Sequence, residues 1–150
     1  MNQELVTLRN AWLGNGASAA CTLFIVGPVE DDRGPDPAFD RFPWQTQRAA
    51  NFLKFLIQLD GSHPGVVICE RDLPDGNWRD VLEVTASLPH PPPVIVISRL
   101  ADEYLWSEVL NLGGYDLLAK PLDKQELSRT LKLAWGRWVH KGDSTTCSTA

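Results

Sequence analysis

Four short runs of apolar residues organise the chain. They lie at residues 23–26, 66–69, 94–97 and 117–119. Runs this short, rich in β-branched residues and without polar alternation, are typical of strands buried on both faces. Strands of this kind belong to parallel sheets, so we expect the four runs to lie side by side in one sheet.

Helical patterns follow the later runs. They are predicted at residues 77–87, 102–112 and 123–138. The apolar residues that share one helical face are Leu105, Val109 and Leu112 in the second helix and Leu127, Leu131, Ala134 and Trp138 in the third. Asp123 and Glu126 have the spacing of a capping box at the start of the third helix. The alternation of strand and helix predicts right-handed crossovers onto a parallel sheet.

The segment between the first two runs has a weaker pattern. Four residues there break helices: Gly34, Pro35, Pro37 and Pro43. Any helix between residues 30 and 42 is therefore expected to be short or irregular. An edge strand at 44–50 and a helix at 51–58 complete a doubly wound α/β fold of five strands and five helices.

Outside this unit we expect two extensions. Residues 1–20 carry Leu5, Leu8 and Trp12 at amphipathic spacing and form an N-terminal extension. The domain itself spans residues 21–138, and the tail at 139–150 is expected to be disordered. A length of 150 residues suits one domain with a real core.

The charge composition argues against binding to nucleic acid or to an anionic membrane. With a net charge of −5 and a pI near 5.1, the chain has no overall positive potential that would attract nucleic acid or an anionic membrane. Neither a membrane span nor a secretory signal is evident, so the expected compartment is the cytoplasm. Cys21, Cys69 and Cys147 lack metal-ligand spacing and are expected to stay reduced. The three histidines, His63, His90 and His140, are expected to be solvated.

Candidate chemistry lies where the strands end, because parallel sheets gather ligands at the carboxyl ends of their strands. The runs are followed by Gly27, Glu70, Ser98 and Lys120, and Lys120 precedes Pro121. A carboxylate, a hydroxyl group and an ammonium group should therefore converge on one crevice.

The sequence from Glu70 to Pro74 (ERDLP), with Ile97-Ser98 and Lys120-Pro121 following in order, resembles the response regulator receiver domain family, whose members are CheY-like. The resemblance covers roughly residues 21–138. It implies a flavodoxin-like sheet with strand order 2-1-3-4-5, a role in bacterial-type two-component (phosphorelay) signalling, and a cis peptide between Lys120 and Pro121.

In that family an aspartate accepts a phosphoryl group, a hydroxyl residue and a lysine bind it, and two acidic residues after the first strand help to hold magnesium. Here Glu70 stands at the acceptor position, Ser98, Lys120 and Pro121 match the phosphate site, and Gly27-Pro28 replaces the acidic pair. Phosphoryl transfer relies on the metal to neutralise charge. We therefore expect a pseudo-receiver with no cofactor and no enzymatic activity. Asp31, Asp32 and Asp72 are the fallback metal ligands.

Glu70 has two interpretations. It could imitate the phosphorylated state, held by Lys120 and Ser98, or form a purely structural ion pair with Lys120. A conventional phosphotransfer receiver that uses another acidic residue is the alternative function. A small α/β enzyme or nucleotide-binding domain is a third, but residues 27–30 contain no glycine-rich phosphate loop.

The output is expected to be a protein surface. Leu117 stands where the family carries a switching aromatic residue, which agrees with a lost switch. Tyr104, Trp106 and Leu110 add an apolar stripe to helix 102–112, on the face that the family uses for partners and dimers; the alternative is a wider core stripe. The expected partners are a histidine kinase, an output protein or a second copy. Because no output domain follows, we expect a stand-alone receiver.

Overall fold

A computed structural model describes residues 22–27 and 45–149, with side chains described as far as Val139. The N-terminal extension, the irregular helix expected between residues 30 and 42, and Asp31 and Asp32 lie outside the described residues. Within the described part of the chain, no helix is both long and apolar enough to cross a membrane.

The core of the molecule is a five-stranded parallel sheet. Its strands are β1 (Thr22–Val26), β2 (Gln45–Ala49), β3 (Val66–Glu70), β6 (Val94–Ser98) and β7 (Asp116–Ala119). The order across the sheet is β2-β1-β3-β6-β7, and every pairing is parallel. This confirms the predicted order 2-1-3-4-5 and the doubly wound α/β class.

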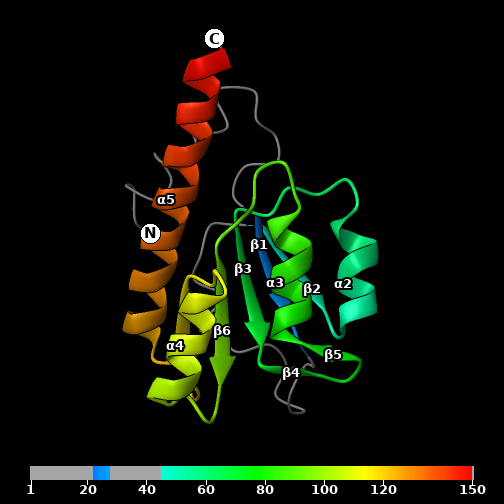
Figure 1. Cartoon of the computed structure of the whole chain (residues 1–150), viewed down its shortest axis with the longest axis vertical. Helices are drawn as coiled ribbons and strands as arrows, with labels where there is room; N and C mark the ends of the chain where they lie inside the picture. The colour runs from blue at the N-terminus through cyan, green and yellow to red at the C-terminus, as the bar shows by residue number, and fades with distance from the viewer. Residues whose placement is uncertain (1–21, 28–44, 150) are drawn as a thin grey trace.

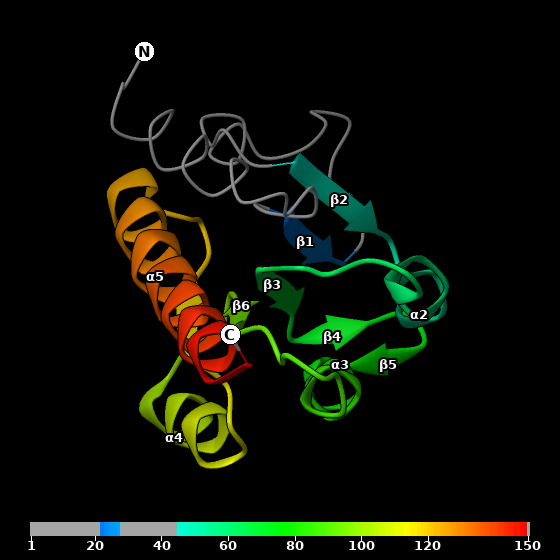
Figure 2. The same ribbon diagram turned by 90° about the horizontal axis from the view of Figure 1, so that it is seen from above.

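Helices cover both faces of the sheet (Figures 1 and 2). They are α2 (Phe52–Leu59), α3 (Trp78–Ala86), α4 (Glu103–Asn111) and α5 (Lys124–Thr149). Alternate residues of each strand serve opposite faces, as the two-residue period of a strand requires. In β1, Phe24 belongs to the core cluster that includes residues of α2, α3 and α4, whereas Leu23 and Ile25 belong to the cluster that includes residues of α5.

A short antiparallel ribbon, β4 (Asp72–Leu73) with β5 (Gly76–Asn77), follows β3 directly and was not predicted. Two-residue strands are too short to give a periodic signal, although the Pro74-Asp75-Gly76 sequence is a turn signal. Asp75 in this turn accepts hydrogen bonds from the backbone N–H groups of Phe52 (2.7 Å) and Leu53 (3.0 Å). The ribbon therefore caps α2.

The C-terminal helix is longer than expected. We predicted an end near Trp138 and a disordered tail at 139–150, whereas α5 runs to Thr149. No proline interrupts residues 139–149, and helical hydrogen bonds are local, so the helix can continue without further core contacts. The predicted buried side of α5 is confirmed at Leu127, Leu131, Ala134 and Trp138.

Candidate functional site

Three neighbouring strand ends bring Glu70, Ser98 and Lys120 to one edge of the sheet. Glu70 is the last residue of β3 and is paired with Ile97 of β6. Ser98 ends β6, and its carbonyl accepts a hydrogen bond from the Lys120 backbone N–H (3.0 Å) just after β7. The convergence expected from the sequence is therefore present.

Glu70 and Lys120 form an ion pair in this crevice. The Lys120 Nζ donates a hydrogen bond to Glu70 Oε1, and both side chains are only about one-sixth exposed, at 16% and 15%. A pair this sheltered is screened much less by salt than a surface pair. The lysine expected to meet a phosphate is thus already engaged with a carboxylate of the chain itself.

Ser98 is buried beside the pair, and its hydroxyl group has a local role. Ser98 Oγ accepts a hydrogen bond from the Leu100 backbone N–H (3.1 Å). The bond fixes the turn that leaves β6, which is the loop-hydroxyl role that short polar side chains commonly take.

Gly27 is part of the site in a way that sequence reasoning missed. It has a φ of +152°, and a Cβ atom at this position would lie 2.3 Å from the Cγ of Glu70. The Glu70 side chain therefore occupies the space that any side chain at position 27 would need. A glycine after the first strand was the available signal, but the approach of Glu70 is a tertiary contact.

The described residues do not fit a magnesium site. Magnesium requires several close oxygen ligands, and Gly27 supplies no side chain where acidic ligands would be needed. Asp72 is exposed in β4, and the described residues contain no group of three His, Cys, Asp or Glu side chains suited to a metal.

Cys69 precedes Glu70 and is free and buried. Burial, together with the nearby negative charge of Glu70, raises the pKa of its thiol far above the ordinary range. Because the thiolate is the nucleophilic form, this thiol is chemically inert at neutral pH.

Comparison with known families decides the identity of this fold. The family model of the response regulator receiver domain matches residues 39–132, which is more than half of the chain. The chain belongs to this family. It is therefore a receiver domain of two-component signalling.

Curated relatives of the receiver include the transcriptional regulatory protein DpiA of Escherichia coli K12, which is 26% identical over 83 residues. That match covers 55% of this chain, and the receiver spans only 37% of the length of DpiA.

Solved structures agree on the fold. A two-component response regulator from Clostridium difficile has a TM-score of 0.68 at 18% identity, covering 78% of this chain and 97% of that one. A CheY-like receiver domain protein from Methanospirillum hungatei JF-1 has a TM-score of 0.67 at 18% identity, covering 81% and 98%.

The family resemblance also predicted a cis peptide after β7 and the loss of a switching aromatic residue within it. The Lys120–Pro121 peptide is cis, as predicted. Leu117 stands at the position of the switching aromatic residue and is buried in the core against α4. A buried leucine there cannot swing between core and surface as an exposed aromatic ring can.

The predicted partner surface is exposed. Tyr104, Trp106 and Leu110, which we call the α4 patch, are 79%, 46% and 37% exposed, so the alternative of a wider core stripe does not hold. Trp106 Nε1 donates to Asp116 Oδ1 (3.3 Å), which orients the ring against β7. Leu112, predicted to be buried, is 52% exposed because it follows the last turn of α4.

Proposed function

We propose that this receiver is a cytoplasmic protein-binding module that works without accepting a phosphoryl group. The observation that carries the proposal is the Glu70–Lys120 ion pair, packed over Gly27, at the position of the family's phosphorylation site. Membership of the receiver family supports a role in two-component signalling, and the site geometry supports the loss of the chemistry.

The geometry opposes phosphoryl transfer in three ways. Lys120, which would stabilise a transferred phosphoryl group, is already bound to Glu70. The Glu70 side chain lies over Gly27, where the family would place metal ligands. Glutamate also reaches about 1.5 Å further than aspartate, so its carboxylate is displaced from the position of a normal acceptor.

The ion pair provides a permanent substitute for the switch. A carboxylate carries about one negative charge, whereas a phosphoryl group carries nearly two, so Glu70 imitates only part of the phosphorylated state. With Leu117 buried in place of a mobile aromatic ring, the receiver lacks the family's aromatic switch. Its output is then contact through the α4 patch with a histidine kinase, an output protein or a second copy of the chain.

Titration with magnesium and beryllofluoride, an analogue of the phosphoryl group, tests this proposal. We expect no saturable change in the amide NMR signals of Glu70, Ser98 and Lys120, because the lysine is engaged and the metal ligands are missing. A conventional receiver with an aspartate acceptor is the positive control. Saturable, magnesium-dependent shifts in the wild-type chain would show a working acceptor site and refute the proposal.

A further inference from the structure

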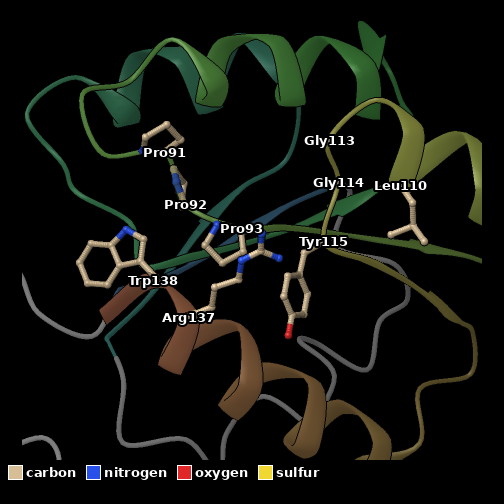
Figure 3. Close-up of a pocket in the computed structure, with 9 residues that line it drawn as sticks. All are labelled: Pro91, Pro92, Pro93, Leu110, Gly113, Gly114, Tyr115, Arg137 and Trp138. Carbon is tan, nitrogen blue, oxygen red and sulfur yellow. The ribbon is translucent and has the colours of Figure 1, made fainter. Parts of the chain in front are cut away.

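A cavity of about 390 Å³ lies at the opposite edge of the sheet from Glu70. It is bounded by the Pro91–Pro93 segment before β6, by the Gly113-Gly114 turn before β7, and by the C-terminal half of α5 (Figure 3). Its size is in the range of sites that hold small molecules. The phosphorylation-site residues lie at the carboxyl ends of the strands and take no part in it.

The walls of the cavity combine apolar side chains with polar groups. Trp138 is 6% exposed, and its indole ring lies close to two aromatic neighbours. His90 stacks on it with ring centroids 4.5 Å apart, and Trp135 lies 5.2 Å away. The solvated position expected for His90 is therefore wrong, because α5 brings Trp138 against its loop. Opposite Trp138, Leu110 extends into the cavity from α4 (Figure 3).

The backbone offers a ligand few hydrogen-bond donors. The prolines have no N–H group. The N–H groups of Gly113, Gly114 and Tyr115 donate to the carbonyls of Leu110, Val109 and Val94 at 3.1, 2.8 and 2.7 Å. Recognition of a polar ligand group therefore depends on side chains.

Arg137 carries the only charge among the nine residues that line the cavity. Its guanidinium carbon lies 5.8 Å from the centroid of the Tyr115 ring, and Figure 3 shows the two side chains side by side, with the Tyr115 hydroxyl group at the end of the ring that is far from the guanidinium group. This cation–π contact holds the guanidinium group at the cavity, and its N–H groups can still make a bidentate contact. Arg137 forms no ion pair with any residue that the structure describes.

We propose that this cavity binds a small monocarboxylate with a compact hydrocarbon body. A single guanidinium group matches one carboxylate, and charge-assisted bidentate bonds are the strong form of that contact. The proline, leucine and tryptophan walls match an apolar body, and the lining contains no acidic group that would repel the anion. Preformed aromatic walls reduce the entropy lost on binding.

Leu110 belongs both to the cavity and to the α4 patch. A ligand in the cavity would therefore contact a residue of the α4 patch, which is the surface that the proposed function uses. Ligand binding could then regulate partner binding in a receiver that is not phosphorylated. This coupling rests on the proposed function, whereas binding to the cavity does not.

Titration of the ¹⁵N-labelled chain with cyclohexanecarboxylate tests the site, with cyclohexanecarboxamide as the uncharged isostere. We expect saturable shifts of the Gly113, Gly114 and Tyr115 amides. Arg137→Gln should weaken binding at least about tenfold, since a charge-assisted contact is lost, and the amide should bind equally weakly. Tyr115→Leu should weaken binding by a smaller factor, because it removes the ring that the Arg137 guanidinium group contacts.

Lys132→Gln is the matched control: it removes an exposed positive charge from the same helix, outside the cavity, and should leave the affinity unchanged. Near-UV circular dichroism checks that each variant is folded. The proposal is overturned if the wild-type chain shows no saturable shift at Gly113 and Gly114, or if Arg137→Gln binds the carboxylate as well as the wild type does. Either result would leave the beryllofluoride test of the proposed function unaffected.

Discussion

At the scale of single residues, Gly27 and Glu70 depend on each other. Gly27→Ala should destabilise the fold by about 1–3 kcal/mol, because the new Cβ atom would meet Glu70 Cγ at 2.3 Å and the positive φ adds backbone strain. Urea denaturation measures the loss. Gly61→Ala is the matched control, since its φ is +78° but nothing lies within 4 Å of the added Cβ atom. Equal losses in the two variants would show that contact with Glu70 is unimportant.

The ion pair between Glu70 and Lys120 permits a double-mutant cycle. Glu70→Gln and Lys120→Met should each cost about 1–3 kcal/mol, because each leaves a sheltered polar group without its partner. The double variant should lose clearly less than the sum of the two, as measured by urea denaturation. Strictly additive losses would mean that the contact contributes nothing to the fold.

At the scale of elements, Asp75 links the β4–β5 ribbon to α2, and this link depends on pH. Hydrogen bonds from the backbone N–H groups of Phe52 and Leu53 hold the pKa of Asp75 below its ordinary value of 3.8. A lowered pKa in the folded state contributes stability that is complete above pH 3.8 and is lost as the pH falls through the folded-state value. Asp75→Ala should therefore be less stable than the wild type at neutral pH.

Urea midpoints of the two proteins, compared at about pH 7 and about pH 3, test this link, and the difference should shrink at the lower pH. Asp60→Ala, at the opposite end of α2, is the control for the loss of an exposed aspartate at neutral pH. If the difference between wild type and Asp75→Ala is the same at both pH values, the cap does not act through its charge.

The α4 patch gives a prediction about association. Trp106→Ala should change the free energy of unfolding by less than about 1 kcal/mol, because the side chain is 46% exposed, yet it should weaken self-association or partner capture. Sedimentation and thermal melting measure the two effects separately. Leu53→Ala, on exposed α2, is the matched control. A loss of stability with no change in association would remove the patch as a docking surface.

Helices and strands with a strong local sequence pattern could be predicted, and those with a weak pattern could not. The buried strands were predicted because a run such as 66–69 has no polar residue that a surface could use. The β4–β5 ribbon was missed because two-residue strands carry no period. The length of α5 could not be predicted because the polar tail contains no proline, so the sequence does not mark the residue at which the helix ends. Leu112 was misassigned because helical periodicity cannot mark the last turn.

At the scale of the whole molecule, topology made the site predictable in part. The proximity of Glu70 and Lys120, which lie far apart in the sequence, could be predicted because parallel strands place their carboxyl ends at one edge of the sheet. The contact of Glu70 with Gly27 and the cavity around Arg137 could not, since both depend on how closely elements approach. The family resemblance supplied the strand order and the cis peptide, and the structure confirms both.

The intact mass of the chain after incubation with acetyl phosphate and magnesium shows directly whether the receiver accepts a phosphoryl group. An aspartate-bearing receiver treated in parallel shows that the reagent is active, and Glu70→Asp shows whether restoring the acceptor alone is enough. We expect an unchanged mass for the wild-type chain, because Lys120 is bound to Glu70 and Gly27 stands where the family carries a metal ligand. A wild-type chain that gains the mass of one phosphoryl group would contradict it.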